Sequence, residues 1–468
     1  MPKFSSKTLL IALGVLVVAL IAAGIVFLVV KKPKQQAAAH INLTYWGVYD
    51  SKEVMQPIID KYQKLHSNVT ITYEQKKFDS YYDNVTDAFA SGSGPDIFEV
   101  QNSMMAKFQP LMQPLPDNES TIIDKYYDVV AKDAVMDNKV YGLPYSVDSL
   151  ALFYNKRLLN KAGITNPPRT WDEFDVAVEK LTKLDAAGHF IQSGAALGGS
   201  SATINRATDL VSLFMLQQGT PITDQSKNSV VWDETTTSPS GQTVDRPGQR
   251  GLDMYLRYSS ATQPVYTWNE SQDYSFDLFA EEKTAMILSY AYQLPIIRGN
   301  NPKMQLGIAP VPQPKDANQK ITLASYWLET VAAESKNAAT AWDFVKFATN
   351  TENDKLYSTE TNKPASRRDL ITEGLNDPDL STFTDQNLYA ESWYQYDGKK
   401  VEDILDTMVK NLLKGVVTGE DAFDKATSDI QAVISEGAQT KQALQAAAQA
   451  VQQAAKALQA KQKAGSKK

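Results

Sequence analysis

The sequence predicts an α/β protein, because patterns typical of strands and of helices alternate along its 468 residues. Residues 41–47 alternate apolar and polar side chains and end in glycine, which is typical of a strand. Residues 52–65 place apolar side chains at helical spacing, and residues 69–73 alternate again. A strand, a helix and a second strand in this order favour a parallel sheet with a crossover helix.

The same alternation continues towards the C-terminus. Residues 79–90 have helical spacing and are followed by a Ser-Gly run, a proline and a strand pattern at 96–100. A Thr-x-x-Glu capping box at residues 170–173 predicts a helix that extends to Leu184. A pair of helices is expected within residues 401–435. The predicted body therefore mixes strands and helices over its whole length.

An apolar run without any charge extends from Leu9 to Val30. As a helix it would span about 33 Å, and the hydrocarbon core of a bilayer is about 30 Å thick. We therefore predict that residues 1–39 form an N-terminal transmembrane helix, which anchors the chain, and its linker. A cleaved signal peptide is the alternative, since residues 37–39 are alanines, but its apolar core is usually about 7–15 residues long. The flanking positive charges balance, so they do not orient the helix.

The composition excludes several kinds of site. There is no cysteine, which removes disulfides, thiolate catalysis and cysteine-bound metals. The histidines His40, His66 and His189 are scattered without metal-ligand spacing, so we expect neither a metal nor a cofactor. The net charge is −7, but the first 39 and last 32 residues hold eleven lysines and no acid, which leaves about −18 on the body. Such a body repels phosphate backbones and argues against nucleic-acid partners.

The last residues, 437–468, are rich in Ala, Gln and Lys, which are good helix formers. Leu444, Val451 and Leu458 recur every seven positions, but two heptads are too few to establish a coiled coil. We predict a C-terminal helical tail. A solvated helix, a partner-binding helix and a basic element that contacts lipid all remain open.

Sequence motifs of catalysis are absent. There is no G-x-S-x-G elbow, no phosphate-binding loop that ends in Gly-Lys-Ser/Thr and no H-E-x-x-H. A glycoside hydrolase needs only two carboxylates about 5–10 Å apart, and the chain has 54 acidic residues. We do not expect an enzyme, but a glycoside hydrolase stays an alternative at this stage.

Aromatic residues stand at the ends of several predicted segments. Flat rings beside polar groups suit sugars, whose ring faces are apolar and whose edges carry hydroxyls. Most Trp and Tyr residues only pack in a core, so each of these is a candidate ligand contact and no more. The candidates are Trp46, Tyr49, Tyr290, Tyr292, Tyr326, Trp327, Trp393 and Tyr394, together with the neighbouring carboxylate Asp50.

Several short blocks occur in an order that resembles one known family. They are Tyr45-Trp46-Gly47, Gly94-Pro95-Asp96-Ile97, the block from Val140 to Asp148, Phe153-Tyr154-Asn155-Lys156, the block from Pro168 to Glu173, Gly307 to Pro312, and Asn362 to Arg368. Over residues 40–436 the chain resembles the extracellular solute-binding protein family 1, which includes maltose-binding protein and supplies ABC transporters. Each block is weak alone, but the ordered set is specific.

The resemblance implies a two-lobed periplasmic-binding-protein fold, of the type II or Venus flytrap kind, with three crossings between the lobes. Residues 40–147 and 328–362 would form lobe 1, and residues 148–327 and 363–436 would form lobe 2. A ligand, here a sugar or oligosaccharide, would lie in the cleft and be captured by hinge closure.

The resemblance also places binding residues. Asp148 resembles the acidic residue that hydrogen-bonds sugar hydroxyls, although it could instead cap a turn at the hinge. Tyr292 stands where the family often has a stacking aromatic ring. Gln101, Asn102 and Ser103 follow a strand at a loop that commonly lines the cleft, but they differ from maltose-binding protein there, which puts maltose in doubt as the ligand.

The same resemblance implies the partners and the location. The body would face the extracytoplasmic side of the cell membrane, held by a single-pass helix, and would deliver its ligand to the permease subunits of an ABC transporter. Free or lipid-anchored relatives are common, so the predicted membrane helix is a departure from the family pattern. An anchored sensory or adhesive module that presents its ligand state to another partner remains an alternative.

Overall fold

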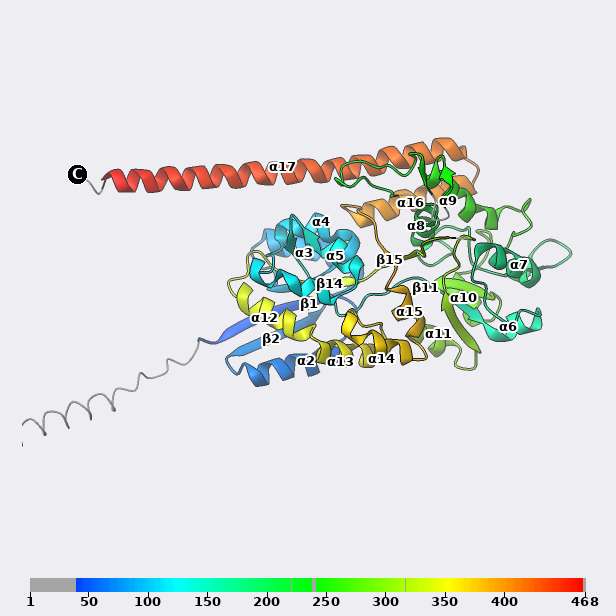
Figure 1. Ribbon diagram of the computed structural model, residues 1–468, viewed down its shortest axis with the longest axis horizontal. Helices are drawn as coiled ribbons and strands as arrows, with labels where there is room; N and C mark the ends of the chain where they lie inside the picture. Colours follow the sequence, from blue (N-terminus) through cyan, green and yellow to red (C-terminus); the bar gives the residue numbers. More distant parts are fainter. Residues whose placement is uncertain (1–38, 220, 238–240, 316, 466–468) are drawn as a thin grey trace, which may run out of the picture.

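The computed structural model describes residues 39–219, 221–237, 241–315 and 317–465 (Figure 1). The predicted transmembrane helix, Leu9 to Val30, lies outside these residues. Among the described residues, no helix has both the length and the apolar composition that crossing a bilayer requires. The body of the chain forms two lobes, each with its own sheet and its own cluster of buried apolar side chains.

The first lobe contains a four-stranded sheet in the order β14-β3-β1-β2. Its strands are β1 (Ile41–Gly47), β2 (Val69–Gln75), β3 (Ile97–Gln101) and β14 (Trp327–Val331). β1 pairs in parallel with β2 and β3, so the predicted strand–helix–strand unit is confirmed. β14 returns from the second lobe and pairs antiparallel with β3. The first lobe is therefore completed by a distant segment of the chain.

Helices surround this sheet (Figure 1). They are α2 (Lys52–Leu65), α3 (Tyr81–Ala90), α4 (Met105–Phe108), α5 (Asp128–Ala134), α12 (Ala338–Ala348) and α13 (Thr351–Thr361), with 3₁₀ turns η1 (Phe78–Ser80), η2 (Asn102–Met104), η3 (Gln109–Leu111) and η4 (Asp117–Lys125). In α2, the buried residues Met55, Ile58, Ile59 and Tyr62 are three, one and three positions apart and form one apolar face. This face explains why the helix packs on the sheet.

The second lobe contains an antiparallel sheet of three strands, with β6 (Ala151–Asn155) between β11 (Met286–Ser289) and β12 (Leu306–Pro310). The remaining helices are α6 (Lys156–Lys161), α7 (Trp171–Leu181), α8 (Ala207–Gln217), α9 (Pro247–Leu256), α10 (Ser275–Ala280), α11 (Leu294–Asn300), α14 (Ile371–Asn376), α15 (Ser381–Gln386), α16 (Gly398–Leu413) and α17 (Gly419–Gly465), and the 3₁₀ turns η5 (Arg257–Ser259), η6 (Ala291–Gln293) and η7 (Arg368–Leu370).

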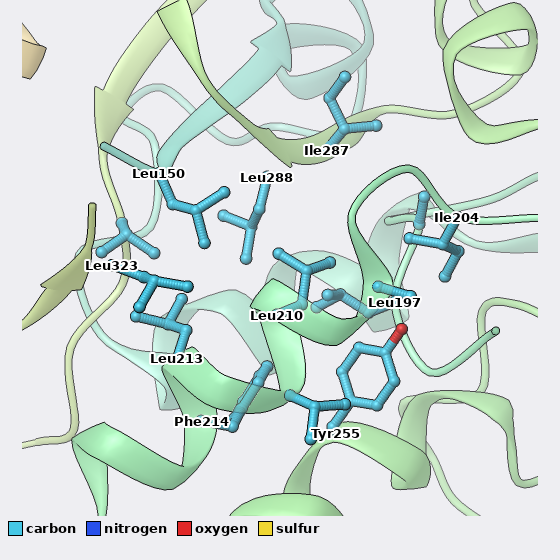
Figure 2. Close-up of a cluster of buried hydrophobic side chains, with 14 of the residues drawn as sticks. Leu150, Leu197, Ile204, Leu210, Leu213, Phe214, Tyr255, Ile287, Leu288 and Leu323 are labelled. Atoms are coloured by element: carbon cyan, nitrogen blue, oxygen red, sulfur yellow. The ribbon is translucent and has the colours of Figure 1, made fainter. Parts of the chain in front are cut away.

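Helix α8 lies at the centre of this lobe. Its residues Leu210, Leu213 and Phe214 lie among side chains of the sheet and of the crossing segments, such as Leu288 and Leu323 (Figure 2). Because α8 is apolar around most of its circumference, it can be stable only when other elements enclose it. This buried helix fixes the position of the polar residues at its N-terminus, which become important below.

Short strands form the remaining pairs. They are β4 (Val135–Met136) with β5 (Lys139–Val140), β7 (Lys183–Leu184) with β8 (Phe190–Gln192), β9 (Thr236–Thr237) with β10 (Thr243–Val244), and β13 (Thr322–Leu323) with β15 (Ala390–Glu391). The predicted cap of α7 is confirmed, since Thr170 Oγ1 accepts a hydrogen bond from the Glu173 N–H at 3.2 Å. The predicted end at Leu184 is wrong, because Leu184 pairs with β8 and the helix has already ended at Leu181.

The segments that join the lobes lie side by side. Ser149 bridges to Ala324 in antiparallel register, and Ser146 bridges in the same way to Ala365. Two backbone hydrogen bonds of 3.0 Å reinforce the first pair, from the Leu150 N–H to the Leu323 oxygen and from the Ser325 N–H to the Asp148 oxygen. Bending at this narrow ladder would move one lobe relative to the other without disturbing either core.

The buried clusters show where the chain changes lobes. Val147 belongs to the first cluster and Leu150 to the second, and on the return Leu323 belongs to the second and Ala324 to the first. Ala390 packs with the first cluster again, although its neighbours along the chain pack with the second. The predicted lobe bounds did not include this late return and stay a prediction.

Helix α17 runs through the boundary expected between body and tail, at residues 436 and 437, which stays a prediction. Its first part, including Phe423 and Ile430, is buried in the second lobe's cluster. The whole helix, Gly419–Gly465, has 47 residues and continues through Gly437 without a break. A single interior glycine lowers helix stability by only about 1 kcal/mol relative to alanine, and the helix formers around it compensate.

Two carboxylates are buried opposite each other in the first lobe. Glu99 on β3 and Glu329 on β14 are direct partners in the antiparallel register, and they are 4% and 3% exposed. The Val48 N–H donates to Glu99 at 2.9 Å, and the Tyr45 hydroxyl donates to Glu329 at 2.5 Å. Burial raises the pKa of both carboxyls well above the usual range, and each negative neighbour adds to this effect.

This pair predicts that stability falls as pH rises. A carboxyl with a raised pKa keeps its proton in the folded state at pH values where the unfolded chain has lost it, so the free energy of unfolding decreases as pH rises above about 4.5 through the folded-state pKa. Glu99→Gln removes one of these ionisations. We expect urea denaturation of the variant to show a smaller loss of stability between pH 5 and pH 8 than the unchanged protein shows. The exposed control Glu360→Gln should keep the original pH dependence; equal slopes in all three proteins would contradict the prediction.

Candidate ligand-binding cleft

A cavity of about 420 Å³ lies between the two lobes. The first lobe contributes η1, the start of α3, and η2 with α4. The second lobe contributes the N-terminal turns of α8 and of α16. Residues 323–325 and 392–397, which connect the lobes, complete the lining. A ligand in this cavity would touch both lobes and the segments that join them.

The first lobe forms an aromatic wall beside the cavity. Tyr49 stacks on Phe78 with ring centroids 5.6 Å apart, and Tyr82 stacks on Trp327 at 5.9 Å with the ring planes only 10° apart. Tyr49 is 55% exposed and Phe78 is 42% exposed. Tyr49 follows the C-terminal end of β1, and Trp327 begins β14, which runs antiparallel to β1 and β3, so both residues lie at the same edge of the sheet. Accessible ring faces of this kind suit a flat apolar surface on a ligand.

The predicted residues Gln101, Asn102 and Ser103 line the cavity. The Gln101 amide donates to Ser325 Oγ at 3.1 Å, and the Asn102 amide donates to Asp133 at 3.0 Å. Both side chains are thus held in place by neighbours before any ligand binds. The strand-end loop is therefore an organised polar edge of the first lobe's wall.

The second lobe contributes a charged network that the sequence did not predict. The guanidinium of Arg206 donates to both carboxylate oxygens of Asp209, at 2.8 and 2.9 Å, and lies 3.5 Å from Glu402. Asp209 also accepts the hydroxyl of Tyr290 at 2.7 Å. Arg206, Asp209 and Glu402 all line the cavity. The i,i+3 spacing of Arg206 and Asp209 was the only signal in the sequence, and it is common on helix surfaces.

The backbone of Arg206 adopts the left-handed conformation, with φ of 54°. A non-glycine residue in this conformation costs about 1–2 kcal/mol, and such residues cluster at functional sites. Here the conformation places the guanidinium beside the first turn of α8, where Asp209 holds it. The strained backbone of Arg206 is thus found together with a fixed orientation of its guanidinium in the cleft.

The aromatic wall and the charged network face each other. The pKa of the Tyr49 hydroxyl is raised, first by burial of the hydroxyl and then by the nearby Tyr292, whereas Arg206 acts in the opposite direction. Tyr292 stacks on Tyr290 with centroids 5.9 Å apart and is itself 38% exposed. Tyr49 of the first lobe therefore lies near Tyr292 and Arg206 of the second lobe, although only Arg206 of these three lines the cavity.

The comparisons with known proteins agree with this arrangement. Residues 49–355 match the family described as bacterial extracellular solute-binding protein. The chain belongs to this family. A binding protein of Brucella abortus is 24% identical over 328 residues, which cover 68% of this chain and 74% of the relative. The diacetylchitobiose-binding protein of Streptomyces coelicolor is 23% identical and covers 68% and 71% of the two chains.

Solved structures show the same fold. The sugar-binding protein MalE of Xanthomonas citri superposes on this solute-binding protein with a TM-score of 0.69 at 15% identity, covering 86% of this chain and 99% of that one. The predicted family and the predicted two-lobed α/β fold are therefore confirmed. The family consists of binding proteins, and among the described residues no group of three or more acidic or histidine side chains could hold a metal ion.

Several residues predicted to bind ligand have other partners in this solute-binding protein. Asp50 accepts hydrogen bonds from Lys363 at 2.7 Å and from Tyr357 at 2.6 Å. The Lys76 ammonium lies 3.9 Å from the ring centre of Trp46. The predicted residues that do not line the cavity are Trp46, Tyr49, Asp50, Asp148, Tyr290, Tyr292, Tyr326, Trp327 and Tyr394.

Three aromatic candidates from the later part of the chain differ in position. Tyr326 is buried and donates its hydroxyl to Asp133 at 2.7 Å. Tyr394 lies half-buried, with the Lys227 ammonium 5.4 Å from its ring centre. Trp393, in contrast, lines the cavity, and its indole N–H is buried without a hydrogen-bond partner among the described residues. Of these three aromatic residues, only Trp393 is therefore placed where it could contact a ligand in the cavity.

Asp148 is engaged by the backbone. Its carboxylate accepts hydrogen bonds from the N–H groups of Ser149, Ala291 and Tyr292, at 2.9, 2.9 and 3.0 Å. Burial raises the pKa of Asp148 to about 7, although these three donors act in the opposite direction. The carboxylate therefore ties a crossing segment to the turn that carries Tyr292, which matches the second of the two roles considered for it.

This geometry predicts the effect of Asp148→Asn. An asparagine offers one acceptor and directs an NH₂ group at backbone donors, so at least one buried N–H loses its partner. We expect the free energy of unfolding to fall by about 1–3 kcal/mol at neutral pH, measured by urea denaturation. The exposed variant Asp128→Asn serves as a control and should change stability by less than about 0.5 kcal/mol. An unchanged stability of Asp148→Asn would show that the three hydrogen bonds contribute nothing.

Proposed function

We propose that this protein captures a neutral sugar or oligosaccharide between its lobes, on the extracytoplasmic side of a membrane, and delivers it to an ABC transporter. The observation that supports this most is the pairing of two unlike walls in one cleft. Phe78 of the first lobe lines the cavity with an exposed ring on which Tyr49 stacks, and Arg206 with Glu402 of the second lobe offers fixed polar groups. A sugar ring has an apolar face and a polar edge that match these walls.

The charged network suits hydroxyl groups better than an anion. Arg206 already has the carboxylates of Asp209 and Glu402 beside it, so its charge is compensated before a ligand binds. An anionic ligand such as phosphate would favour an uncompensated arginine cluster. A hydroxyl can accept from the Arg206 guanidinium and donate to Glu402, and bonds of this kind to charged groups contribute about 1.5–3 kcal/mol.

The relatives favour the same class of ligand. Their names include a diacetylchitobiose-binding protein of Streptomyces coelicolor and a maltotriose-binding protein of Pyrococcus abyssi. One solved structure with this fold is a cyclo/maltodextrin-binding protein in complex with maltotetraose. These names differ in sugar and linkage, so they support carbohydrate as a class and leave the individual sugar to experiment.

Capture follows from the hinge. A ligand that binds one wall gains contacts with the other only when the lobes close, so it shifts the equilibrium towards the closed form by its difference in affinity for the two forms. The paired crossing segments, with Ser149 opposite Ala324, allow this movement while both cores stay intact. A transporter that recognises the closed form would then select the loaded protein.

The sugar proposal predicts a specific loss of affinity. Purified protein should bind at least one of maltotriose, diacetylchitobiose and an arabino-oligosaccharide in isothermal titration calorimetry, without hydrolysing it. Glu402→Gln should weaken that binding about tenfold or more, and Tyr49→Ala should do the same through loss of the ring face. The remote control Glu360→Gln should bind as the unchanged protein does. Release of smaller sugars during the titration would favour the glycoside hydrolase alternative.

We further propose that Leu9 to Val30 forms a single-pass anchor with the body outside the cytoplasm. The support is the length of the apolar run and the extracellular character of the family. Protease added to intact cells should remove the body, and the protein should stay in the membrane fraction after a high-salt wash. Complete protection of a protein that is present would contradict the outward orientation. Sugar uptake that persists without this protein would favour a sensory or adhesive role.

A further inference from the structure

The C-terminal helix α17 is fixed in the second lobe. Its residues Phe423, Ala426, Ile430 and Ile434 are at most 2% exposed and belong to that lobe's buried cluster. α17 also packs along α16, whose N-terminal turn lines the cleft. Because these contacts occupy the first part of the helix, any movement of the second lobe must carry α17 with it.

The helix does not end where the second lobe ends. Figure 1 shows α17 running along the long axis of the molecule and past the first lobe. Gly437 allows it to pass the segment that leads into α16, because a Cβ at this position would lie 2.5 Å from the Tyr396 ring. Tyr396 itself has a left-handed backbone, with φ of 57°, which turns its ring towards the helix. The approach is close and leaves little room for a different path.

One turn further on, α17 contacts the first lobe. Lys441 Nζ lies 2.8 Å from Asp137 Oδ1, at the tip of the β4–β5 hairpin. Asp137 and Asn138 both have positive φ, of 51° and 59°, which is the geometry of a tight hairpin turn. Val140 of the same hairpin is buried in the first lobe's cluster, so Asp137 is fixed in that lobe. The ion pair therefore joins the two lobes.

We propose that α17 is a strap between the lobes, and that the Lys441–Asp137 ion pair biases the hinge towards the arrangement described here. A rigid helix that is part of one lobe transmits every rotation of that lobe to its far end. Opening or closing the cleft must therefore change the distance between Lys441 and Asp137. This inference rests on the proposed hinge closure and adds an element that regulates it from outside the cleft.

A second ion pair also connects the two lobes. Lys107 of the first lobe lies 2.8 Å from Asp397, the residue that caps α16 in the second lobe. The Lys441 and Asp137 side chains are about half exposed, at 50% and 53%, so their ion pair is weak and sensitive to salt. A weak contact can adjust a hinge equilibrium without locking it, and its effect on the ratio of the two arrangements should be about two- to fivefold.

The test measures the lobe arrangement directly in the full-length protein without ligand. Because the chain has no cysteine, Lys52→Cys in the first lobe and Lys161→Cys in the second can carry a single pair of spin labels. Pulsed electron–electron double resonance spectroscopy then gives the distribution of distances between the two labels, and so between the lobes. Lys441→Glu and Asp137→Lys should each shift this distribution, and the combined exchange, which restores the ion pair in reverse, should return it towards the original.

The control is Lys425→Glu, which breaks an ion pair with Asp429 inside α17 and leaves the contact between the lobes intact. It should keep the original distance distribution, and all variants should melt cooperatively. A distribution unchanged by Lys441→Glu and Asp137→Lys, or single-variant shifts that the combined exchange does not reverse, would overturn the strap. Because no sugar is present, a failure to find a sugar ligand leaves this result unaffected.

Discussion

The narrow ladder between the lobes is the constraint on which the rest of the structure depends. Ser149 pairs with Ala324 and Ser146 pairs with Ala365, so the connecting segments support one another through backbone hydrogen bonds. Backbone pairing of this kind satisfies polar groups that would otherwise be buried without partners. The apolar side chains beside the ladder divide between the two cores, since Val147 and Ala324 pack in the first and Leu150 and Leu323 in the second. A hinge can bend there because neither core has to be repacked.

Residues around this ladder both stabilise the junction and position the aromatic side chains of the cleft. Asp148 uses its carboxylate to hold the turn that carries Tyr292, and so connects a crossing segment to one wall of the cleft. On the first lobe, Lys363 and Tyr357 hold Asp50 next to Tyr49. Acidic residues near a cleft are therefore not all ligand contacts. Several of them position the aromatic residues beside them, and their own hydrogen-bonding capacity is used within the protein.

The candidate site could be predicted only in part, and the missing part has a physical reason. Gln101, Asn102, Ser103 and Trp393 line the cavity, because each follows or flanks a segment whose end the sequence pattern already marked. Arg206 and Glu402 are 196 positions apart along the chain and meet only because α8 and α16 pack together in the second lobe. Tyr326 is a residue that was predicted as a ligand contact but does not line the cavity. An aromatic residue at the end of a strand can turn into the core and donate its hydroxyl to a buried carboxylate.

The sequence by itself determined the periodic features: the parallel strands of the first lobe, the capped helix at Thr170, and the ordered blocks that carry the family resemblance. These features depend on neighbours a few positions away, so local pattern is enough to predict them. Only the tertiary structure decided that Asp148 faces three backbone N–H groups, that Arg206 opposes an aromatic wall, and that α17 reaches the first lobe. Each of these depends on the packing of segments that are far apart in the chain, and residue type alone does not specify which of many possible partners a side chain will meet.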